Sequence, residues 1–427
     1  MAPFFVVEGG HRLSGTVRPA GNKNAALPIL AATLLADGPC TLENVPRIRD
    51  VETMLELLVA QGVTAAWEGE HTLALDARHA KATDPDPALC GKIRASVLLA
   101  GPLLARFGRV RLPPPGGDVI GRRRIDTHLL ALQRLGAEVS VGASFDFEAK
   151  QLVGAEVFLD EASVTGTENA LMAAVAARGR TVLRNAASEP HVQDLGHFLV
   201  ALGARIEGIG TNTVTVEGGA VLKGARFAIG PDHIEVGSFV GLAAVTNSAL
   251  TIEGVRAEDL RATLMGFERL GVAPRLDGDR LIVAAGQARR IQDDLGGHVS
   301  KLEDGPWPAF PADLMSIALV TATQCEGLLL LFEKMFESRL FFVDKLIGMG
   351  ARIVLCDPHR AVVAGPSALH AGTVESPDIR AGMAILLAAL AAEGTSTIHN
   401  VGQIERGYER IHERLTALGA VIERRER

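Results

Sequence analysis

The strongest constraint on the fold is a short phrase that recurs six times along the chain. Each copy reads as the end of an amphipathic helix, then a glycine, then the start of a β-strand, and the glycines stand 67 to 79 residues apart. A glycine directly after a helix adopts the left-handed conformation with little strain, so each phrase predicts a helix C-terminus followed by a strand. The six glycines are Gly62, Gly136, Gly203, Gly271, Gly350 and Gly419.

A second signature, an apolar helix followed by a strand-forming run, precedes each phrase. The runs lie at 40–45, 109–112, 181–186, 249–255, 328–333 and 396–401. The segments 169–177, 237–246 and 379–392 are apolar on nearly every face, which is typical of a helix buried on all sides. They are shorter than the ~20 residues needed to span a bilayer, so we expect them in a protein interior.

Six units of this βαβ type predict an α/β protein with sheets outside and helices inside, in two lobes of three units each. A solenoid of stacked repeats is the alternative. Solenoid repeats usually span about 20–50 residues, whereas these span about 70, so the two-lobed architecture is favoured.

The composition disfavours several classes of function. The chain has 427 residues, 48% of them hydrophobic, and a formal net charge of −7. A nucleic-acid partner is disfavoured because such proteins usually present a basic face. The start of the sequence lacks a basic segment followed by a long apolar core, so we expect no signal peptide, no membrane partner and a cytoplasmic location.

Signatures of cofactor-dependent and nucleophilic enzymes are missing. No GxGxxG follows a strand, and the sequence contains neither a P-loop nor a GxSxG elbow. No His/Cys cluster has the spacing of a metal site, so we expect no metal and no organic cofactor. The four cysteines lack CxxC spacing and predict buried free thiols: Cys40, Cys90, Cys325 and Cys356.

The stretch 111–128 combines a loop with an unusual charge pattern. Prolines and glycines forbid regular structure across 113–117, and Asp118 follows them directly. Three arginines stand at 122–124, and Asp126 then precedes a helical pattern. Because a guanidinium binds phosphate or carboxylate through two hydrogen bonds, this loop is a candidate site for anion chemistry. A solvated surface loop is the alternative.

Other charged residues stand where a loop enters an apolar helix. Lys23 follows Asn22 at such a junction, where free N–H groups and the helix dipole suit a phosphate. A capped helix with a solvated lysine is the alternative there. Asp313 could be only the N-cap of the next helix, and Asp378 with Arg380 only a cap and a local ion pair. Since these junctions occupy equivalent places in different repeats, we expect them to cluster where the lobes face each other.

With these residues in view, the whole chain resembles the enolpyruvyl transferases that act on UDP-N-acetylglucosamine. The matching phrases, in the family's order, are GNKNAALPIL, NVPRIRDVETM, KIRASVLLAGPLLARFG, PGGDVIGRRRIDTH, SVTGTENALMAA, NAASEP, PDHIEVGSF, FPADLM, FESR, PDIRAG and RGYERI. The resemblance implies two inside-out α/β domains built of six repeats, in agreement with the repeat count. We expect one domain to hold residues 1–21 and 231–427 and the other to hold residues 22–230.

The reaction that the resemblance implies moves the enolpyruvyl group of phosphoenolpyruvate to the 3′-hydroxyl of UDP-N-acetylglucosamine and releases phosphate. It is the first committed step of peptidoglycan synthesis. The two small-molecule substrates are therefore the expected partners.

Roles for individual residues follow from the same resemblance. Lys23 and Asn24 would bind phosphoenolpyruvate, and Arg123 and Arg406 would hold its phosphate and carboxylate. The residues expected around the UDP-sugar are Arg94, Arg123, Arg124, Ile125, Asp126, Thr127, Ser163, Val164, Asp313 and Met335. Those expected to line the closed cleft are Arg339, Asp378 and Arg380.

The reaction needs one acid, one base and cations that stabilise phosphate and carboxylate. Asp118 would protonate the methylene carbon of phosphoenolpyruvate, and Asp313 would take the proton of the sugar hydroxyl. Two carboxylates with opposite tasks need different environments. Lys23, Arg123 and Arg406 would supply electrostatic stabilisation, which is usually the larger effect.

Three features depart from the common family pattern. Most members have Cys where this chain has Asp118, and epoxides of the fosfomycin type alkylate that cysteine, so we expect this chain to resist them. Glu161 stands where many members have Lys, which leaves the diphosphate contact there open. The loop reads GRRRID instead of the commoner small-Arg-Pro pattern, so Arg122 has no assigned role, and Arg124 has none beyond its place in the segment expected around the UDP-sugar.

Two other readings stay open. A transferase acting on shikimate 3-phosphate shares the fold, but the GNKNAAL and PGGD loops favour the UDP-sugar enzyme. A non-catalytic paralogue that binds the UDP-sugar would be expected to lack Asp313 or Lys23, and both are present.

Overall fold

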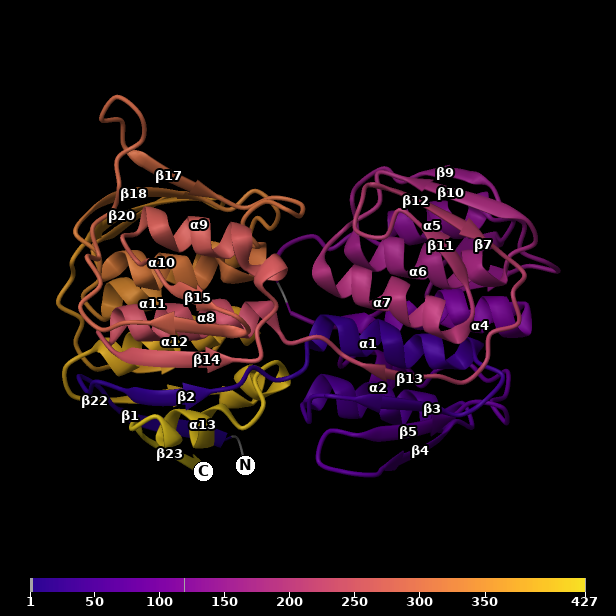
Figure 1. Cartoon of the computed structure of the whole chain (residues 1–427), viewed down its shortest axis with the longest axis horizontal. Coiled ribbons are helices and arrows are strands. Elements are labelled where there is room, and N and C mark those ends of the chain that lie inside the picture. The colour runs from indigo at the N-terminus through magenta and orange to yellow at the C-terminus, as the bar shows by residue number, and fades with distance from the viewer. Residues whose placement is uncertain (1–2, 119, 427) are drawn as a thin grey trace. The chain divides into compact units, whose positions relative to one another are not determined.

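The computed structural model describes residues 3–118 and 120–426, which form two compact units. Unit 1 comprises residues 3–20, 120–122 and 231–426. Unit 2 comprises residues 21–118 and 123–230. In each unit of Figure 1 the sheets lie on the outside and helices lie between them.

The division differs from the expected boundaries at two places. Gly21 belongs to unit 2, and residues 120–122 belong to unit 1 although both flanking segments belong to unit 2. Backbone hydrogen bonds explain the second difference. Arg122 N donates to Glu337 Oε1 at 2.9 Å, and Ser338 N donates to the carbonyl of Ile120 at 3.2 Å.

Unit 1 contains three four-stranded sheets around three buried helices (Figure 1). The sheets are β2 (Ser14–Val17), β14 (Ala249–Glu253), β16 (Arg280–Val283) and β15 (Arg275–Asp277); β17 (Ser300–Glu303), β18 (Gly327–Phe332), β20 (Arg360–Gly365) and β19 (Ile353–Asp357); and β21 (Thr373–Glu375), β22 (Thr395–His399), β1 (Pro3–Glu8) and β23 (Val421–Glu426). The buried helices are α8 (His233–Val245), α10 (Met315–Thr323) and α12 (Ile379–Ala391). The other helices are α9 (Arg261–Arg269), α11 (Val343–Gly348), α13 (Ile411–Ala417) and the 3₁₀ turns η3 (Ala257–Leu260), η4 (Ala312–Leu314), η5 (Arg339–Phe342) and η6 (Val401–Arg406).

Unit 2 repeats this plan with one strand fewer among its described residues. Its sheets are β13 (Arg226–Ala228), β3 (Cys40–Glu43), β5 (Leu73–Asp76) and β4 (Thr64–Trp67); β6 (Arg109–Leu112), β8 (Phe145–Glu148) and β7 (Glu138–Val141); and β9 (Glu156–Phe158), β10 (Arg180–Arg184), β12 (Thr213–Glu217) and β11 (Arg205–Glu207). Its inner helices are α1 (Lys23–Ala32), α4 (Ala100–Phe107) and α6 (Val164–Ala176). The remaining helices are α2 (Arg49–Ala60), α3 (Pro87–Cys90), α5 (Asp126–Arg134), α7 (Pro190–Leu202), η1 (Thr33–Leu35) and η2 (Arg94–Leu99).

All the four-stranded sheets have the same internal order. The first strand pairs in parallel with the second. The third pairs antiparallel with the second, and the fourth pairs antiparallel with the third, as in β17–β18–β20–β19 and β9–β10–β12–β11. The parallel pairs β17–β18, β9–β10 and β21–β22 are joined through a buried helix, which is the βαβ unit read from the repeats. Strands β2 and β14 also pair in parallel, although the whole of unit 2 lies between them along the chain.

The local signals of the repeats are confirmed. Each of the six glycines that end the recurring phrase has a positive φ, between 71° for Gly271 and 114° for Gly203. A residue with a Cβ adopts this conformation only with strain, which explains why glycine ends each of these helices. Strands β3, β6, β10, β14, β18 and β22 overlap the six predicted runs.

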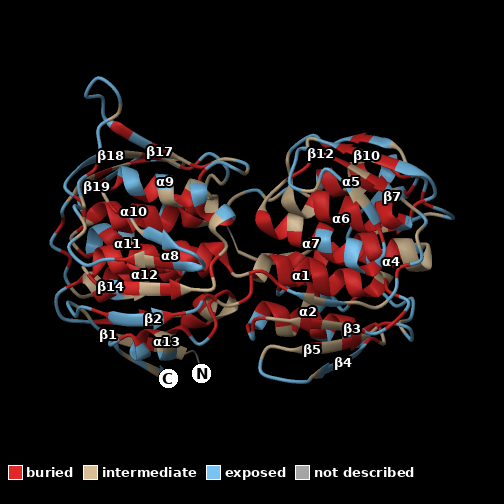
Figure 2. Ribbon diagram, in the orientation of Figure 1, coloured by how far each residue is buried: buried red, intermediate tan, exposed pale blue. Residues whose placement is uncertain are grey.

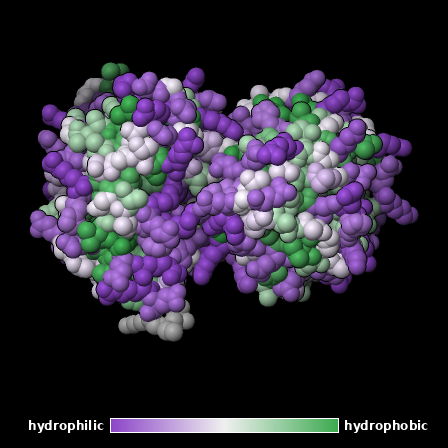
Figure 3. Space-filling model, turned by 60° about the horizontal axis from the view of Figure 1, so that its bottom comes forward, coloured by the Kyte–Doolittle hydropathy of each residue, from purple (hydrophilic) through white to green (hydrophobic). Residues whose placement is uncertain are grey.

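Hydrophobic side chains gather in two separate cores, one in each unit. Every residue of α8 and α10 is buried, as the all-apolar pattern predicted (Figure 2). On the face shown in Figure 3, hydrophobic residues lie in separate patches among hydrophilic ones. No described helix is long and apolar enough to cross a bilayer. All four cysteines are free, but the prediction that all are buried is wrong for Cys356, which is exposed at the outer strand β19.

Candidate active site

Lys23 is the first residue of α1 and lies at a capped helix N-terminus. The Asn22 side chain accepts hydrogen bonds from the N–H groups of Asn24 (2.8 Å) and Ala25 (3.3 Å), so the capping expectation holds. The lysine is not solvated, however. Its Nζ lies 3.5 Å from Asp50 Oδ2, and the two side chains are only 13% and 6% exposed. The junction therefore holds a largely buried cation beside the positive end of a helix.

The proline–glycine loop packs against two of the predicted arginines. Gly117 has a φ of +105°, and a Cβ built on it would lie 2.8 Å from the Cβ of Arg94. Arg94 Nη2 donates to the carbonyls of Arg123 (2.7 Å) and Arg124 (2.9 Å). Burial, and then repulsion by Arg123, lowers the pKa of Arg94 to about 10. The loop that carries Asp118, a half-buried residue, thus lies against Arg94.

Two helix N-termini of unit 2 are joined through Asp160. Arg124 forms ion pairs of 3.1 Å with Asp126 and Asp160, and the Thr127 hydroxyl donates to Asp160 Oδ1 at 2.7 Å. Ser163 caps α6 by accepting from Gly166 N. The predicted residues of this group therefore lie together: Arg124, Ile125, Asp126 and Thr127 at the start of α5, and Ser163 and Val164 at the start of α6. Glu161 is exposed.

A buried histidine in the same region was not identified from the sequence. His128 Nδ1 accepts from Asn169 Nδ2 at 2.7 Å, so its Nε2–H is free to donate to Thr165 Oγ1 at 3.0 Å. Burial, and then the charge of Arg94, lowers the pKa of His128 to about 3, so the ring is neutral at physiological pH. The available signal was its place beside Thr127 in the matched phrase.

Asp313 holds two buried arginines in unit 1 and does not cap a helix. No side chain caps η4, in which Asp313 lies. Its Oδ1 accepts from Arg339 Nη2 at 3.1 Å, and its Oδ2 accepts from Arg380 Nε at 3.0 Å. The arginine side chains are 4% and 5% exposed, whereas that of Asp313 is 28% exposed. The carboxylate is therefore partly exposed to solvent, while the two arginines that hold it are buried.

Asp378 caps α12, accepting from the N–H groups of Arg380 and Ala381 at 2.8 Å. The alternative reading of a cap is therefore correct for Asp378, while Arg380 makes its ion pair with Asp313 and not only a local one. Although burial alone would lower the pKa of Arg380, Asp313 raises it overall.

Two aromatic residues that the sequence analysis did not single out support this group. The Arg380 guanidinium lies 5.4 Å from the ring centre of Tyr408, whose hydroxyl lies 2.8 Å from Ser238 Oγ. His233, the first residue of α8, is buried; burial and Arg380 lower its pKa to about 4, while Asp313 opposes this effect. Both residues lie within the matched phrases RGYERI and PDHIEVGSF.

The remaining predicted residues of unit 1 lie in separate segments. Arg406 ends η6, is half-buried and donates to Gln403 Oε1 at 2.9 Å. Met335 is 40% exposed in the loop after β18.

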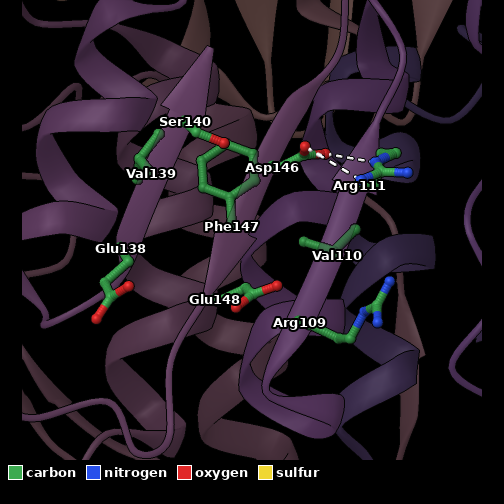
Figure 4. Close-up of a pocket in the computed structure, with 9 residues that line it drawn as sticks. All are labelled: Arg109, Val110, Arg111, Glu138, Val139, Ser140, Asp146, Phe147 and Glu148. Atoms are coloured by element: carbon green, nitrogen blue, oxygen red, sulfur yellow. Dashed lines mark hydrogen bonds and ion pairs between the residues drawn. The ribbon is translucent and has the colours of Figure 1, made fainter. Parts of the chain in front are cut away.

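A shallow hollow of about 320 Å³ lies elsewhere, on the sheet β6–β8–β7 of unit 2 (Figure 4). Its charged side chains come from neighbouring strands, and Arg111 Nε pairs with Asp146 Oδ1 at 2.7 Å. None of the predicted site residues lines it, so we do not assign the chemistry to this hollow. Among the described residues, no group of His, Cys, Asp and Glu could hold a metal ion.

Comparison with known proteins identifies the family. Residues 7–415 match the family model described as EPSP synthase (3-phosphoshikimate 1-carboxyvinyltransferase). The chain is 68% identical over 425 residues to the UDP-N-acetylglucosamine 1-carboxyvinyltransferase of Bradyrhizobium diazoefficiens, covering 99% of both chains. It is 56% identical over 418 residues to the protein of the same name from Treponema pallidum, covering 98% of both.

Solved structures show the same fold. The enolpyruvyl transferase NikO from Streptomyces tendae superposes with a TM-score of 0.88 at 25% identity, with 99% of both chains covered. EPSP synthase from Acinetobacter baumannii superposes with a TM-score of 0.73 at 19% identity over the full length of both. The inside-out α/β architecture, the six repeats and the full-length matches together establish that this chain belongs to the enolpyruvyl transferase family.

Proposed function

We propose that this chain transfers the enolpyruvyl group of phosphoenolpyruvate to the 3′-hydroxyl of UDP-N-acetylglucosamine, with release of phosphate. The observation that carries the proposal is the 68% identity, over 99% of both chains, to a protein named UDP-N-acetylglucosamine 1-carboxyvinyltransferase. The two EPSP synthase structures share only 19% sequence identity with this chain, so their similarity supports the fold alone. The UDP-sugar is therefore favoured over shikimate 3-phosphate as acceptor, and the reaction is the first step of peptidoglycan synthesis.

The chemistry requires three proton transfers and one group transfer. A proton adds to the methylene carbon of phosphoenolpyruvate while the 3′-oxygen bonds to its C2 and the hydroxyl proton leaves to a base. The resulting tetrahedral ketal then loses phosphate from C2 and a proton from the methyl carbon, which restores the double bond. Each transfer of this kind typically contributes about 10² to 10⁴-fold in rate.

We assign the residues that bind the anionic groups, and the general acid, to unit 2. Lys23 is largely buried at a helix N-terminus, which suits a phosphate group. Arg123, with its main chain held by Arg94, supplies a second cation, and Asn24 lies one residue from Lys23. Asp118 on the adjoining loop is the proposed acid. The N-termini of α5 and α6, joined through Asp160, are the proposed nucleotide-sugar site.

In unit 1 we assign the general base to Asp313. Two guanidinium groups within 3.1 Å favour its ionised form, and its partial exposure leaves it open to a substrate hydroxyl. Arg406 is proposed to hold the carboxylate of phosphoenolpyruvate, and Met335 to contact the UDP-sugar.

The test is phosphate release by the purified protein with phosphoenolpyruvate and UDP-N-acetylglucosamine. We expect turnover with this pair, a product heavier than the acceptor by one enolpyruvyl group, and none with either substrate alone. Turnover with shikimate 3-phosphate instead would identify the sister activity. Binding of the UDP-sugar without any turnover would identify a non-catalytic paralogue.

A further inference from the structure

Two carboxyl groups are buried together behind Arg339. Strands β17 and β18 pair in parallel with Glu303 opposite Phe332, so the next residues, Asp304 and Glu333, leave the sheet side by side. Asp304 is 1% exposed and Glu333 is fully buried. One oxygen of each is fixed by the main chain, since Asp304 Oδ1 accepts from Lys334 N and Glu333 Oε1 accepts from Phe336 N.

The remaining oxygens imply a shared proton. In the part of the chain that the structure describes, Asp304 Oδ2 and Glu333 Oε2 lack a donor of adequate geometry, although the β17–β18 register and the bond from Lys334 N to Asp304 Oδ1 place the two side chains next to each other. Two carboxylates in contact repel each other, whereas an acid and a carboxylate form a strong hydrogen bond. Burial, with a further contribution from Asp304, raises the pKa of Glu333 to about 9, against the opposing effect of Arg339.

Arg339 lies between this pair and the proposed base. Its Nε is 3.5 Å from Glu333 Oε2, and its Nη2 is 3.1 Å from Asp313 Oδ1. Its guanidinium carbon lies 4.9 Å from the ring centre of Phe336, so the group is also packed on its face. A charge on Glu333 would therefore compete with Asp313 for the same guanidinium.

We propose that Glu333 is a positioning residue: it remains a neutral acid bonded to Asp304 and thereby leaves the charge of Arg339 directed at Asp313. This inference rests on the proposed function, because it assumes that Asp313 is the base. An ionised Glu333 would draw Arg339 away from Asp313.

The other charged groups near Glu333 do not neutralise its carboxyl group. His359 Nδ1 donates to its main-chain carbonyl at 2.7 Å, and Lys334 Nζ pairs with Glu303 at 2.7 Å. Arg380 pairs with the far oxygen of Asp313, and Glu337 accepts from Arg122 N.

The activity test compares Glu333→Gln, Glu333→Ala and the exposed control Glu423→Gln in the full-length protein, with kcat measured between about pH 6 and pH 10. The amide is neutral and can donate to Asp304, so Glu333→Gln should stay within about threefold of wild type near pH 7.5, whereas Glu333→Ala should lose about tenfold or more. The ratio of wild-type to Glu333→Gln activity should then fall as the pH passes about 9, because only the wild type ionises there. Glu423→Gln should follow wild type throughout.

A second measurement does not depend on turnover. The infrared difference spectrum of wild type minus Glu333→Gln near pH 7 should contain the carbonyl band of a protonated carboxyl group, and the band should weaken as the pH rises through about 9. The proposal is overturned by a missing band, by an activity ratio that is flat with pH, or by a Glu333→Gln variant as slow as Glu333→Ala. If the wild type has no turnover, the proposed function is refuted. The infrared band alone would then show whether Glu333 is a neutral acid beside Asp304.

Discussion

Removal of the Asp313 side chain should both stop turnover and destabilise unit 1. The two arginines it holds are 4% and 5% exposed, and breaking a buried ion pair by removing one partner typically costs about 3–5 kcal/mol. Because the Asp313 side chain is itself 28% exposed, water can partly replace it, and we expect about 2–3 kcal/mol for Asp313→Ala. A residue that only caps a helix would cost about 1 kcal/mol.

Glu333 gives this prediction a dependence on pH. In the Asp313→Ala variant, Arg339 can recover a negative partner if Glu333 ionises. Because the pKa of Glu333 is about 9, its ionisation costs roughly 2 kcal/mol near pH 7.5 and almost nothing near pH 9. The free-energy difference between wild type and Asp313→Ala should therefore shrink as the pH rises from about 7 to 9.

The assay uses the two tryptophans, one in each unit. A Trp67→Phe background leaves Trp307 as the fluorescent reporter of unit 1, and urea unfolding then gives the stability of that unit. Glu423→Ala, which breaks the exposed pair with Arg425, is the matched control and should cost less than about 1 kcal/mol.

Phosphate release should fall about 10² to 10⁴-fold in both Asp313→Ala and Asp313→Asn. An Asp313→Ala protein with near-normal turnover would refute the assignment of the base. An unfolding midpoint equal to that of the control would refute the ion-pair argument, and a cost that is constant with pH would refute the part given to Glu333.

Three further outcomes are expected. Asp118→Cys should become sensitive to fosfomycin in the presence of UDP-N-acetylglucosamine, whereas wild type should resist it because a carboxylate is a weaker nucleophile than a thiolate. The intact mass of each protein is measured after incubation, and an adduct on wild-type Asp118 would contradict the prediction. Lys23→Ala should lose about 10²-fold or more in phosphate release and remain folded by circular dichroism, whereas wild-type-like turnover would leave Lys23 a structural partner of Asp50. The pKa of His128 is about 3 in the folded protein, below its ordinary value of 6.5. Between these two pH values the unfolded chain binds a proton that the folded protein does not. The free energy of unfolding should therefore fall as the pH drops from 6.5 toward 3, by up to ~1.4 kcal/mol per pH unit. His128→Asn should make that slope shallower in urea unfolding, and an unchanged slope would show that His128 is not its source.

The local elements of this protein could be predicted because their signals are short-range. A glycine after an amphipathic helix reports the backbone conformation of that single residue, and Gly62 through Gly419 adopt it at all six predicted places. All-apolar segments predicted the buried helices for the same reason, since a side chain's hydrophobicity does not depend on which neighbour covers it. Cys356 shows the limit: its apolar surroundings predicted burial, but β19 is an outer strand with its side chains partly in solvent.

The sequence predicts which residues form the candidate site, but it leaves the role of several of them open. The junctions of Lys23, Asp313 and Asp378 were each open to two readings, and a cap and a catalytic carboxylate look alike when only the next few residues are known. The structure separates them by partners far along the chain. Asp378 bonds its own helix, whereas Asp313 bonds Arg339 and Arg380, 26 and 67 residues away.

The sequence by itself determined the repeat, the buried helices and the polar junctions, because these depend on backbone preference and on hydrophobicity, which each segment carries alone. Only the tertiary structure decided which partners surround the charged groups. Burial, with a further contribution from Asp304, raises the pKa of Glu333 to about 9, and Asp304 lies beside it because β17 pairs in parallel with β18. Such a pairing depends on register between segments about 30 residues apart, and no property of either segment alone specifies it.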